Sequence, residues 1–250
     1  MKKLFTLLMA GLLSAAMIVS VSAAGANEIL KGTPELDGAL DDIYTQSAVY
    51  TIQEDVVHYA WGGAELQDFS NAVSYFLWDD NYLYICTINA DDTPIVLAGE
   101  KTWMNDAAEL WFIDEGLRHK IHAAADGNLF LGSDGDGVTA YDFDGVQSVG
   151  NYTDDGWCIE VAIPMNNMAA GKEFSFTLQV NNCLDNDATA GSASGSQNAD
   201  YAMKCVAEEV VLPVVEEVVE ESAPQTFDAG IAAAVAAIVS AAGYALSKKR

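Results

Sequence analysis

A regular succession of short apolar segments and acidic turns constrains the fold of this chain more than any other feature. The segments are rich in Val, Ile, Tyr, Phe and Trp and lie at residues 72–78, 82–89, 107–114, 118–124, 138–143, 156–163 and 173–181. Clusters of Asp, Asn and Gly separate them, without helical patterns of about 10 to 15 residues in between. This arrangement predicts an all-β domain, an antiparallel β-sandwich of the jelly-roll kind, because a parallel sheet needs helical crossovers.

One turn cluster, Asp79-Asp80-Asn81, separates two apolar segments. Asp and Asn are common in tight turns because they tolerate left-handed backbone. We therefore expect residues 72–78 and 82–89 to pair as a β-hairpin.

The two ends of the chain do not resemble the part between them. Lys2 and Lys3 precede an apolar stretch, and Ala24-Gly25-Ala26 offers a cleavage site, which predicts a secretory signal peptide at residues 1–26. Residues 229–247 are an uncharged apolar run that stops at three basic residues, 248–250. Such a run is long enough to approach the hydrocarbon core of about 30 Å, so we expect a transmembrane or sorting-signal segment with a basic cytoplasmic tail.

Between the ends we expect one folded domain at residues 33–206 and an acidic Val/Glu/Pro spacer at 207–228. The spacer repels itself and predicts an extended chain, although its valines also suit one face of a helix at residues 214–221. The C-terminal layout resembles the three-part sorting signals of Gram-positive surface proteins. Residues 224–228 stand where the Leu-Pro-x-Thr-Gly motif is expected and lack its glycine.

The charge of the chain excludes one large class of partner. Of the 11 basic residues, two lie in the signal segment and three in the tail, which leaves six against all 37 acidic residues. Such a surface repels phosphate backbones, so we expect no nucleic-acid binding. Neutral ligands or cations suit an exported protein of this charge.

Four cysteines, Cys86, Cys158, Cys183 and Cys205, lie in the exported part. Their spacing contains no Cys-x-x-Cys pair, so zinc binding is not expected. An oxidising compartment permits zero, one or two disulfides, and buried free thiols are the alternative.

Five motifs follow one another along the predicted domain. They occupy residues 34–44 (Pro-Glu-Leu-Asp-Gly-Ala-Leu-Asp-Asp-Ile-Tyr), 77–85, 103–114, 156–164 and 176–181. In this order and spacing they resemble the family 9 carbohydrate-binding modules, β-sandwiches often attached to xylanases and to bacterial surface proteins. The resemblance spans about residues 33 to 206. It implies a non-catalytic domain that binds plant-type polysaccharide or oligosaccharide ends, alongside surface glycoside hydrolases.

The resemblance also implies a carbohydrate-binding site. Trp103 stands where one of the two sugar-stacking tryptophans is expected, Glu109 where the carboxylate is expected, and Gln179 where an amide is expected. Lys120 falls near the position of the family's arginine. The second tryptophan has no counterpart, because residues 196–201 offer only Tyr201 and Asn198.

The chemistry of these residues suits a sugar ring independently of the family. A pyranose presents an apolar face that stacks on an aromatic ring and hydroxyls that need donors and acceptors. Strand alternation at residues 106–114 predicts that Glu109, Trp111 and Ile113 point to one face and Leu110 and Phe112 to the other. The alternative is that Glu109 is a solvated edge residue and Trp103 anchors a loop.

Other candidate sites are less specific. Paired carboxylates are unavoidable among 37 acids and do not indicate a glycosidase. His119 and His122 fall on opposite faces of a strand and predict no metal site. The pairs Asp134/Asp136 and Asp185/Asp187 start like calcium loops but lack the closing Glu, and the alternative is that they are ordinary Asp/Gly turns. The resemblance implies a structural Ca²⁺ in one of the acidic turns, and we expect no required cofactor.

A β-sandwich of this kind suits two other functions, a structural or adhesive role and haem binding. It serves as a scaffold between surface proteins. Haem-binding domains also use it, and Met165, Met168 and Met203 are candidate axial ligands.

Overall fold

The computed structural model describes residues 25–52, 58–64, 72–91, 95–97, 105–131, 145–153, 155–185 and 189–211. The chain divides into two units, residues 1–212 and 213–250, and the second lies wholly outside the described residues. The expected signal peptide, apart from residues 25 and 26, lies outside them as well, as do most of the expected spacer and the whole apolar segment at 229–247. Within the described part of the chain, no helix is long and apolar enough to cross a membrane.

The described elements are thirteen strands and one short 3-10 helix, which confirms an all-β domain. The strands are β1 (Glu28–Lys31), β2 (Val49–Thr51), β3 (His58–Trp61), β4 (Val73–Trp78), β5 (Tyr82–Ala90), β6 (Ala107–Asp114), β7 (Leu117–Ala124), β8 (Leu129–Leu131), β9 (Gln147–Thr153), β10 (Gly156–Pro164), β11 (Glu173–Cys183), β12 (Gly191–Gly195) and β13 (Tyr201–Glu209). The 3-10 helix η1 spans Asp42–Gln46.

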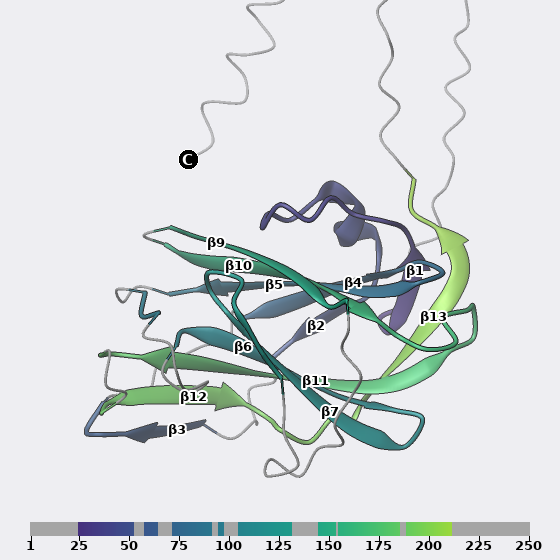
Figure 1. Cartoon of the computed structure of the whole chain (residues 1–250). Helices are drawn as coiled ribbons and strands as arrows, with labels where there is room; N and C mark the ends of the chain where they lie inside the picture. Colours follow the sequence, from purple (N-terminus) through teal and green to yellow (C-terminus); the bar gives the residue numbers. More distant parts are fainter. Residues whose placement is uncertain are drawn as a thin grey trace, which may run out of the picture. The chain divides into compact units, whose positions relative to one another are not determined.

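All strands belong to one hydrogen-bonded sheet that folds over into two layers (Figure 1). The order along the sheet is β8-β7-β6-β11-β13-β1-β4-β5-β10-β9, with β12 and β3 added beside β11 and β2 beside β4. The expectation of a purely antiparallel sheet is wrong at β1. This strand pairs in parallel with both β13 and β4, which it joins, so the sheet is mixed.

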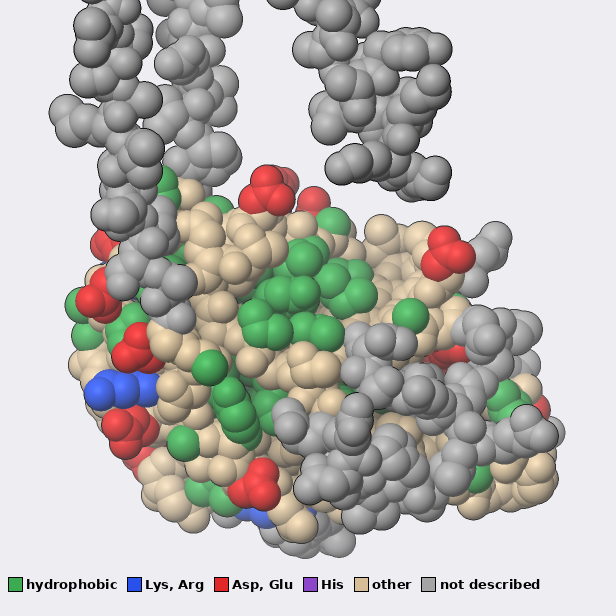
Figure 2. Space-filling model, turned by 180° about the vertical axis from the view of Figure 1, so that it is seen from behind, with side chains coloured by type: hydrophobic (Ala, Val, Ile, Leu, Met, Phe, Trp, Pro, Cys, Tyr) green, Lys and Arg blue, Asp and Glu red, His purple; other side chains and the backbone are tan. Residues whose placement is uncertain are grey.

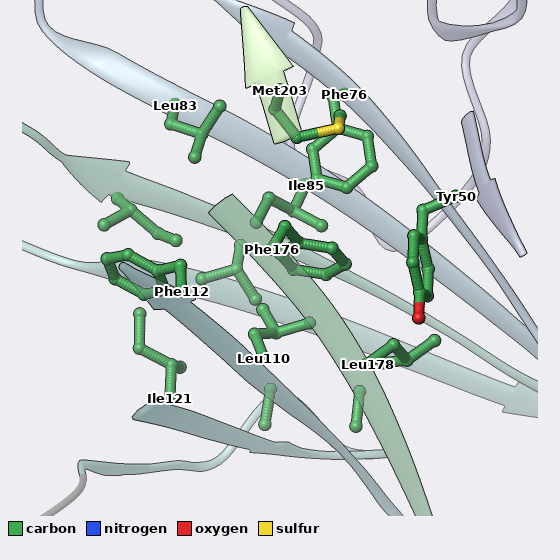
Figure 3. Packing of buried hydrophobic residues seen from close by; sticks show 14 of the residues in the cluster. Tyr50, Phe76, Leu83, Ile85, Leu110, Phe112, Ile121, Phe176, Leu178 and Met203 are labelled. Atoms are coloured by element: carbon green, nitrogen blue, oxygen red, sulfur yellow. The ribbon is translucent and has the colours of Figure 1, made fainter. Parts of the chain in front are cut away.

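The main core fills the space between the two layers. Figure 3 shows side chains from β4 and β5, such as Phe76 and Ile85, facing Leu110, Phe112 and Phe176 from β6 and β11. The rings of Phe76 and Phe176 meet edge to face, with 4.9 Å between their centroids. Burying such aromatic and branched side chains on alternate strand positions is the main force that holds the layers together.

The methionines considered as haem ligands belong to this core. Met165, Met168 and Met203 all pack in the same apolar cluster, where Met203 is 1% exposed. They therefore contribute packing between the layers rather than lining an open pocket.

A second apolar cluster covers the outer face of β4, β5 and β10. It contains Tyr44 of η1, Leu77, Tyr84, Cys86 and Ala162, with Leu36 and Leu40 packed against it. The segment that reads Pro-Glu-Leu-Asp-Gly-Ala-Leu therefore forms a cover over this layer.

A buried carboxylate fastens that cover to the sheet. The Glu160 side chain on β10 is fully buried, and its Oε2 accepts hydrogen bonds of 2.8 Å from the backbone amides of Asp37 and Gly38. Gly38 has a φ of 78°, and a Cβ there would lie 3.1 Å from that of Asn151. The Asp-Gly pair of the motif is thus required by a left-handed turn that aims two amides at one carboxylate.

The Asp79 turn joins β4 and β5 as predicted, for a different physical reason. Among described residues other than glycine, positive φ occurs at Glu115 and Asn167, not at residues 79–81. Instead, Asp79 Oδ1 accepts hydrogen bonds from the amides of Asn81 and Tyr82, at 2.8 and 2.9 Å. The side chain stabilises the turn by satisfying amides that strand pairing leaves unused.

The predicted strands correspond to β4, β5, β6, β7, β10 and β11, while residues 138–143 lie outside the described residues. The strands β1, β2, β3, β8, β9, β12 and β13 were not among those predicted from the sequence. Of these, β9 is mostly polar and β12 consists of Gly, Ser and Ala. The strands run from Glu28 to Glu209, past both ends of the range 33–206.

The surface carries the charge imbalance of the sequence. On the face shown in Figure 2, acidic side chains are spread around the rim and predominate over Lys and Arg, while the largest group of hydrophobic side chains lies near the centre and others are scattered around it.

We predict that Glu160→Ala lowers the free energy of unfolding by about 2–5 kcal/mol, because two amides lose their charged acceptor. The matched control is Glu173→Ala on β11, whose side chain is 73% exposed and which should cost at most about 0.5 kcal/mol. Urea unfolding of both variants measures the difference. Equal, small effects would show that Glu160 does not fasten the cover.

Candidate functional site

Strand pairing places three polar residues in one row on the outer face of β11, β6 and β7. Gln179 on β11 is directly opposite Glu109 on β6, and Glu109 is directly opposite His122 on β7. Their neighbours along each strand, Leu110, Leu178 and Ile121, point into the main core. The alternation predicted for residues 106–114 is thus confirmed.

A second row lies two residues further along the same face. Here Trp111 on β6 is flanked by Thr177 on β11 and Lys120 on β7. The structure therefore brings together three of the predicted site residues, Glu109, Lys120 and Gln179. Trp103, the fourth, lies outside the described residues.

Glu109 is the centre of the hydrogen-bonded network. Its Oε1 accepts a hydrogen bond of 2.9 Å from Asn181 Nδ2 and lies 3.3 Å from His122 Nδ1. Its Oε2 accepts a hydrogen bond of 3.1 Å from the indole nitrogen of Trp111. At 5% exposure in a central strand, Glu109 is a buried carboxylate, and its interpretation as a solvated edge residue is wrong.

The surroundings of Glu109 favour its ionised form. Burial alone raises the pKa of this carboxyl, but the interactions with His122, Lys120 and Asn181 outweigh burial, and the pKa is lowered from its ordinary value. Glu109 is therefore a carboxylate at neutral pH, fixed in place by donors on three strands.

Amide side chains extend the network on the β11 side. Gln179 donates from Nε2 to Asn181 Oδ1 at 2.9 Å, and its Oε1 accepts a hydrogen bond of 3.2 Å from Gln197. The carbonyl of Gln197 accepts a hydrogen bond of 2.8 Å from the guanidinium of Arg118. The loop that holds Gln197 is thereby tied to both β11 and β7.

Two cations lie close to the Trp111 ring. The guanidinium carbon of Arg118 is 4.3 Å from the ring centroid and Nζ of Lys120 is 5.1 Å from it. Both distances suit cation–π attraction, which holds the long side chains over the sheet. Trp111 is only 2% exposed, so it orients its neighbours and does not offer an open stacking surface.

Tyr201 does not supply a second aromatic wall. Its ring packs edge-on against Tyr50, with 5.3 Å between centroids, and its hydroxyl donates to the carbonyl of Ala26 at 3.5 Å. From the loop at residues 196–200, Gln197 is the side chain bonded to the row of Glu109, Gln179 and His122.

Sequence analysis missed His122, Asn181 and Gln197. Asn181 follows Gln179 by two residues and so shares its face, a signal that alternation alone contains. His122 becomes a neighbour of Glu109 through the register of β6 and β7, which the sequence does not specify. Its expected separation from His119 is confirmed, because His119 lies 5.1 Å from the Phe112 ring, on the opposite face.

The residues that the structure describes contain no group of three or more His, Cys, Asp or Glu that could hold a metal ion. Asp134, Asp136 and Asp187 of the two proposed calcium loops lie outside them. Asp185 is described, and its carboxylate accepts hydrogen bonds from the amide and hydroxyl of Thr189.

Two curated proteins are similar to this chain in sequence. Exoglucanase XynX of Acetivibrio thermocellus is 25% identical over 166 residues, which are 64% of this chain and 14% of the exoglucanase. Endo-1,4-beta-xylanase A of Thermoanaerobacterium saccharolyticum is 27% identical over 181 residues, which are 70% of this chain and 15% of the xylanase. The chain thus spans about one seventh of each relative.

Two solved structures share the fold. Both are a carbohydrate binding module family 9 from Caldicellulosiruptor kristjanssonii, one in complex with cellotriose and one with glucose. Each superposes on this chain with a TM-score of 0.57 and is 18% identical to it in sequence. The superposition covers 97% of each solved chain, and 75% and 74% of this chain.

A family model matches most of the described domain. It covers residues 36–201 and is described as carbohydrate family 9 binding domain-like. This range includes both rows of the polar face and, from the cover segment, the two residues whose amides Glu160 binds, Asp37 and Gly38. The chain therefore belongs to the family of carbohydrate family 9 binding domains.

Proposed function

We propose that this chain is a non-catalytic carbohydrate-binding module whose site is the outer face of β11, β6 and β7. The observation that carries the proposal is the row Gln179, Glu109 and His122, which concentrates a carboxylate, an amide and an imidazole on one sheet face. Sugar hydroxyls need paired donors and acceptors of this kind.

The site is built before any ligand arrives. Asn181, His122 and Trp111 already orient the Glu109 carboxylate, so binding costs little side-chain entropy there. A carboxylate offers about four acceptor positions, and these three contacts leave capacity for one hydroxyl donor. Lys120 adds a positive charge on the same face.

We propose that Trp103 provides the apolar stacking surface. It stands two residues before Asn105, which pairs with Leu97 in an isolated bridge, and four before the start of β6. A single aromatic wall binds one face of a sugar and leaves the other to polar contacts, which favours a chain end or short oligosaccharide over a deeply enclosed ring.

The ligand class we propose is the plant-type cellulose and xylan saccharides. The solved modules with this fold are complexes with cellotriose and glucose, and the relatives in sequence are an exoglucanase and a xylanase. Binding to such polysaccharides would hold glycoside hydrolases near their substrate.

We further propose that the domain is displayed on the cell surface. The support is the sequence alone: a signal-like start, an apolar segment at 229–247 and three basic residues after it. The acidic stretch 207–228 would then separate the domain from the membrane.

Calorimetric titration should detect cellotriose or xylotriose binding with a dissociation constant of about 1 μM to 1 mM, because each hydrogen bond contributes about 0.5–1.5 kcal/mol. Titrations with and without Ca²⁺ test the expected structural ion.

Trp103→Ala should remove most of the affinity, because the stacking surface is lost. Tyr152→Ala, which removes an exposed aromatic ring on β9, should not change the affinity. A failure of all plant saccharides, together with unfolding of Trp103→Ala, would favour the structural or adhesive function instead.

Glu109→Gln should weaken oligosaccharide binding by about 10- to 100-fold, because a charged hydrogen bond is worth about 1.5–3 kcal/mol. Glu173→Gln makes the same chemical change on β11 at an exposed position and should leave affinity unaltered. Circular dichroism of both variants verifies folding. Equal affinities in the two variants would place the ligand elsewhere.

Protease added to intact cells should release the domain by cutting within residues 212–226, because an acidic spacer that follows the last strand is accessible to proteases. Immunoblotting of the medium measures the released fragment. Protection in intact cells followed by cleavage after lysis would show that the domain lies inside.

A further inference from the structure

Two of the four cysteines lie side by side on the outer face of the layer that contains β4, β5 and β10. Cys86 on β5 and Cys158 on β10 are diagonal neighbours, because Cys158 is opposite Ile88 and Cys86 is opposite Glu160. Their sulfur atoms are 3.5 Å apart, in van der Waals contact. The pair lies on β5 and β10, away from the polar face of β11, β6 and β7.

The two thiols differ in access to solvent. Cys86 is fully buried, whereas Cys158 is partly exposed and lines a pocket of about 370 Å³. Gly38 and Ala39 of the cover form one wall of this pocket, and Asn151 and Thr153 of β9 form another. A small reagent can therefore reach Cys158 first, with Cys86 directly behind it.

The remaining cysteines cannot form the same arrangement with each other. Cys183 ends β11, while Cys205 on β13 donates its amide to Lys172, just before β11 begins. Eleven residues of strand at about 3.3 Å each separate the two positions by roughly 30 Å or more. Both are fully buried.

We propose that Cys158 and Cys86 form a thiol modification site, in which small-molecule disulfides convert the pair into an intramolecular disulfide. The Cys158 thiolate attacks one sulfur of the reagent and forms a mixed disulfide, which releases one reagent thiol. The Cys86 sulfur, after losing its proton, then attacks Cys158 Sγ and releases the second thiol. The protein gives up two protons and two electrons, and the reagent disulfide is reduced to two thiols.

The geometry supports both steps. The second attack shortens a sulfur–sulfur separation of 3.5 Å to about 2.05 Å, and the two sulfur atoms already face each other from adjacent strands. The pKa of Cys86 is raised by the hydrogen bond with Cys158, by burial and by the charge of Glu160. Cys158, which lines the pocket, is therefore the first thiol to react, because burial and the raised pKa both disfavour reaction at Cys86.

The disulfide would join β5 and β10, two neighbouring strands of the same layer. The bond would close a loop between residues 72 positions apart in sequence. Constraining the unfolded chain over such a loop should raise the melting temperature by about 5–10 °C.

The full chain, treated while folded with oxidised glutathione, should lose two of its four titratable thiols. Peptide mapping after alkylation should find Cys86 linked to Cys158, with Cys183 and Cys205 alkylated after unfolding. The melting temperature should rise and return to its initial value after reduction. A link between any other pair, or a glutathione adduct that persists on Cys158 of the wild type, would overturn the proposal.

Two single variants test the order of attack. Cys86→Ser should stop at one glutathione per chain, attached to Cys158, because the resolving thiol is gone. Cys158→Ser should leave Cys86 unmodified, because Cys86 is buried. If Cys158→Ser takes up glutathione as fast as Cys86→Ser, or if neither variant reacts while folded, Cys158 is not the entry point and the proposal is wrong.

Discussion

The register of β6 against β11 is the constraint on which both the core and the candidate site depend. Leu110 lies opposite Leu178 in the core, and one residue along each strand Glu109 lies opposite Gln179 on the outer face. Because side chains alternate, a slip of one residue would place the carboxylate between the two layers and the leucine in the polar row. The cost of burying Glu109 in an apolar core therefore fixes the register, and the same register builds the polar row of Gln179, Glu109 and His122.

Buried carboxylates bind the loops of this domain to its strands. Glu160 accepts hydrogen bonds from backbone amides of the cover. Asp106 accepts hydrogen bonds of 2.6 and 2.7 Å from the backbone amides of Val96 and Cys183. Burial raises the pKa of Asp106 to about 7, whereas the pKa of Glu109 is lowered although it is buried as well. Two backbone amides do not offset the desolvation of Asp106, while Glu109 has hydrogen bonds with His122 and Asn181 and the positive charge of Lys120 beside it.

The sequence alone predicts correctly which side chains share a face of a long strand. The alternation of β6 places Glu109 and Trp111 on the correct face, and the resemblance selects Lys120 and Gln179, which the sheet then brings to that face. His122 and Gln197 could not be predicted, because their contacts depend on pairing register and on a loop. The parallel pairing of β1 escaped prediction for the same reason, since four residues contain too little pattern to specify a partner.

The outer faces of the two layers differ in their chemistry. The face of β4, β5 and β10 is apolar, and it is covered by the segment that contains η1. The face of β6, β7 and β11 carries carboxylate, amide, imidazole and ammonium groups, and the hydrogen bonds of Glu109 with Asn181 and His122 run from strand to strand. Apolar burial on one side holds the sheet rigid, and that rigidity holds the polar groups of the other side within hydrogen-bonding distance. A site built across three central strands cannot rearrange without unpairing them, so its geometry is as stable as the fold.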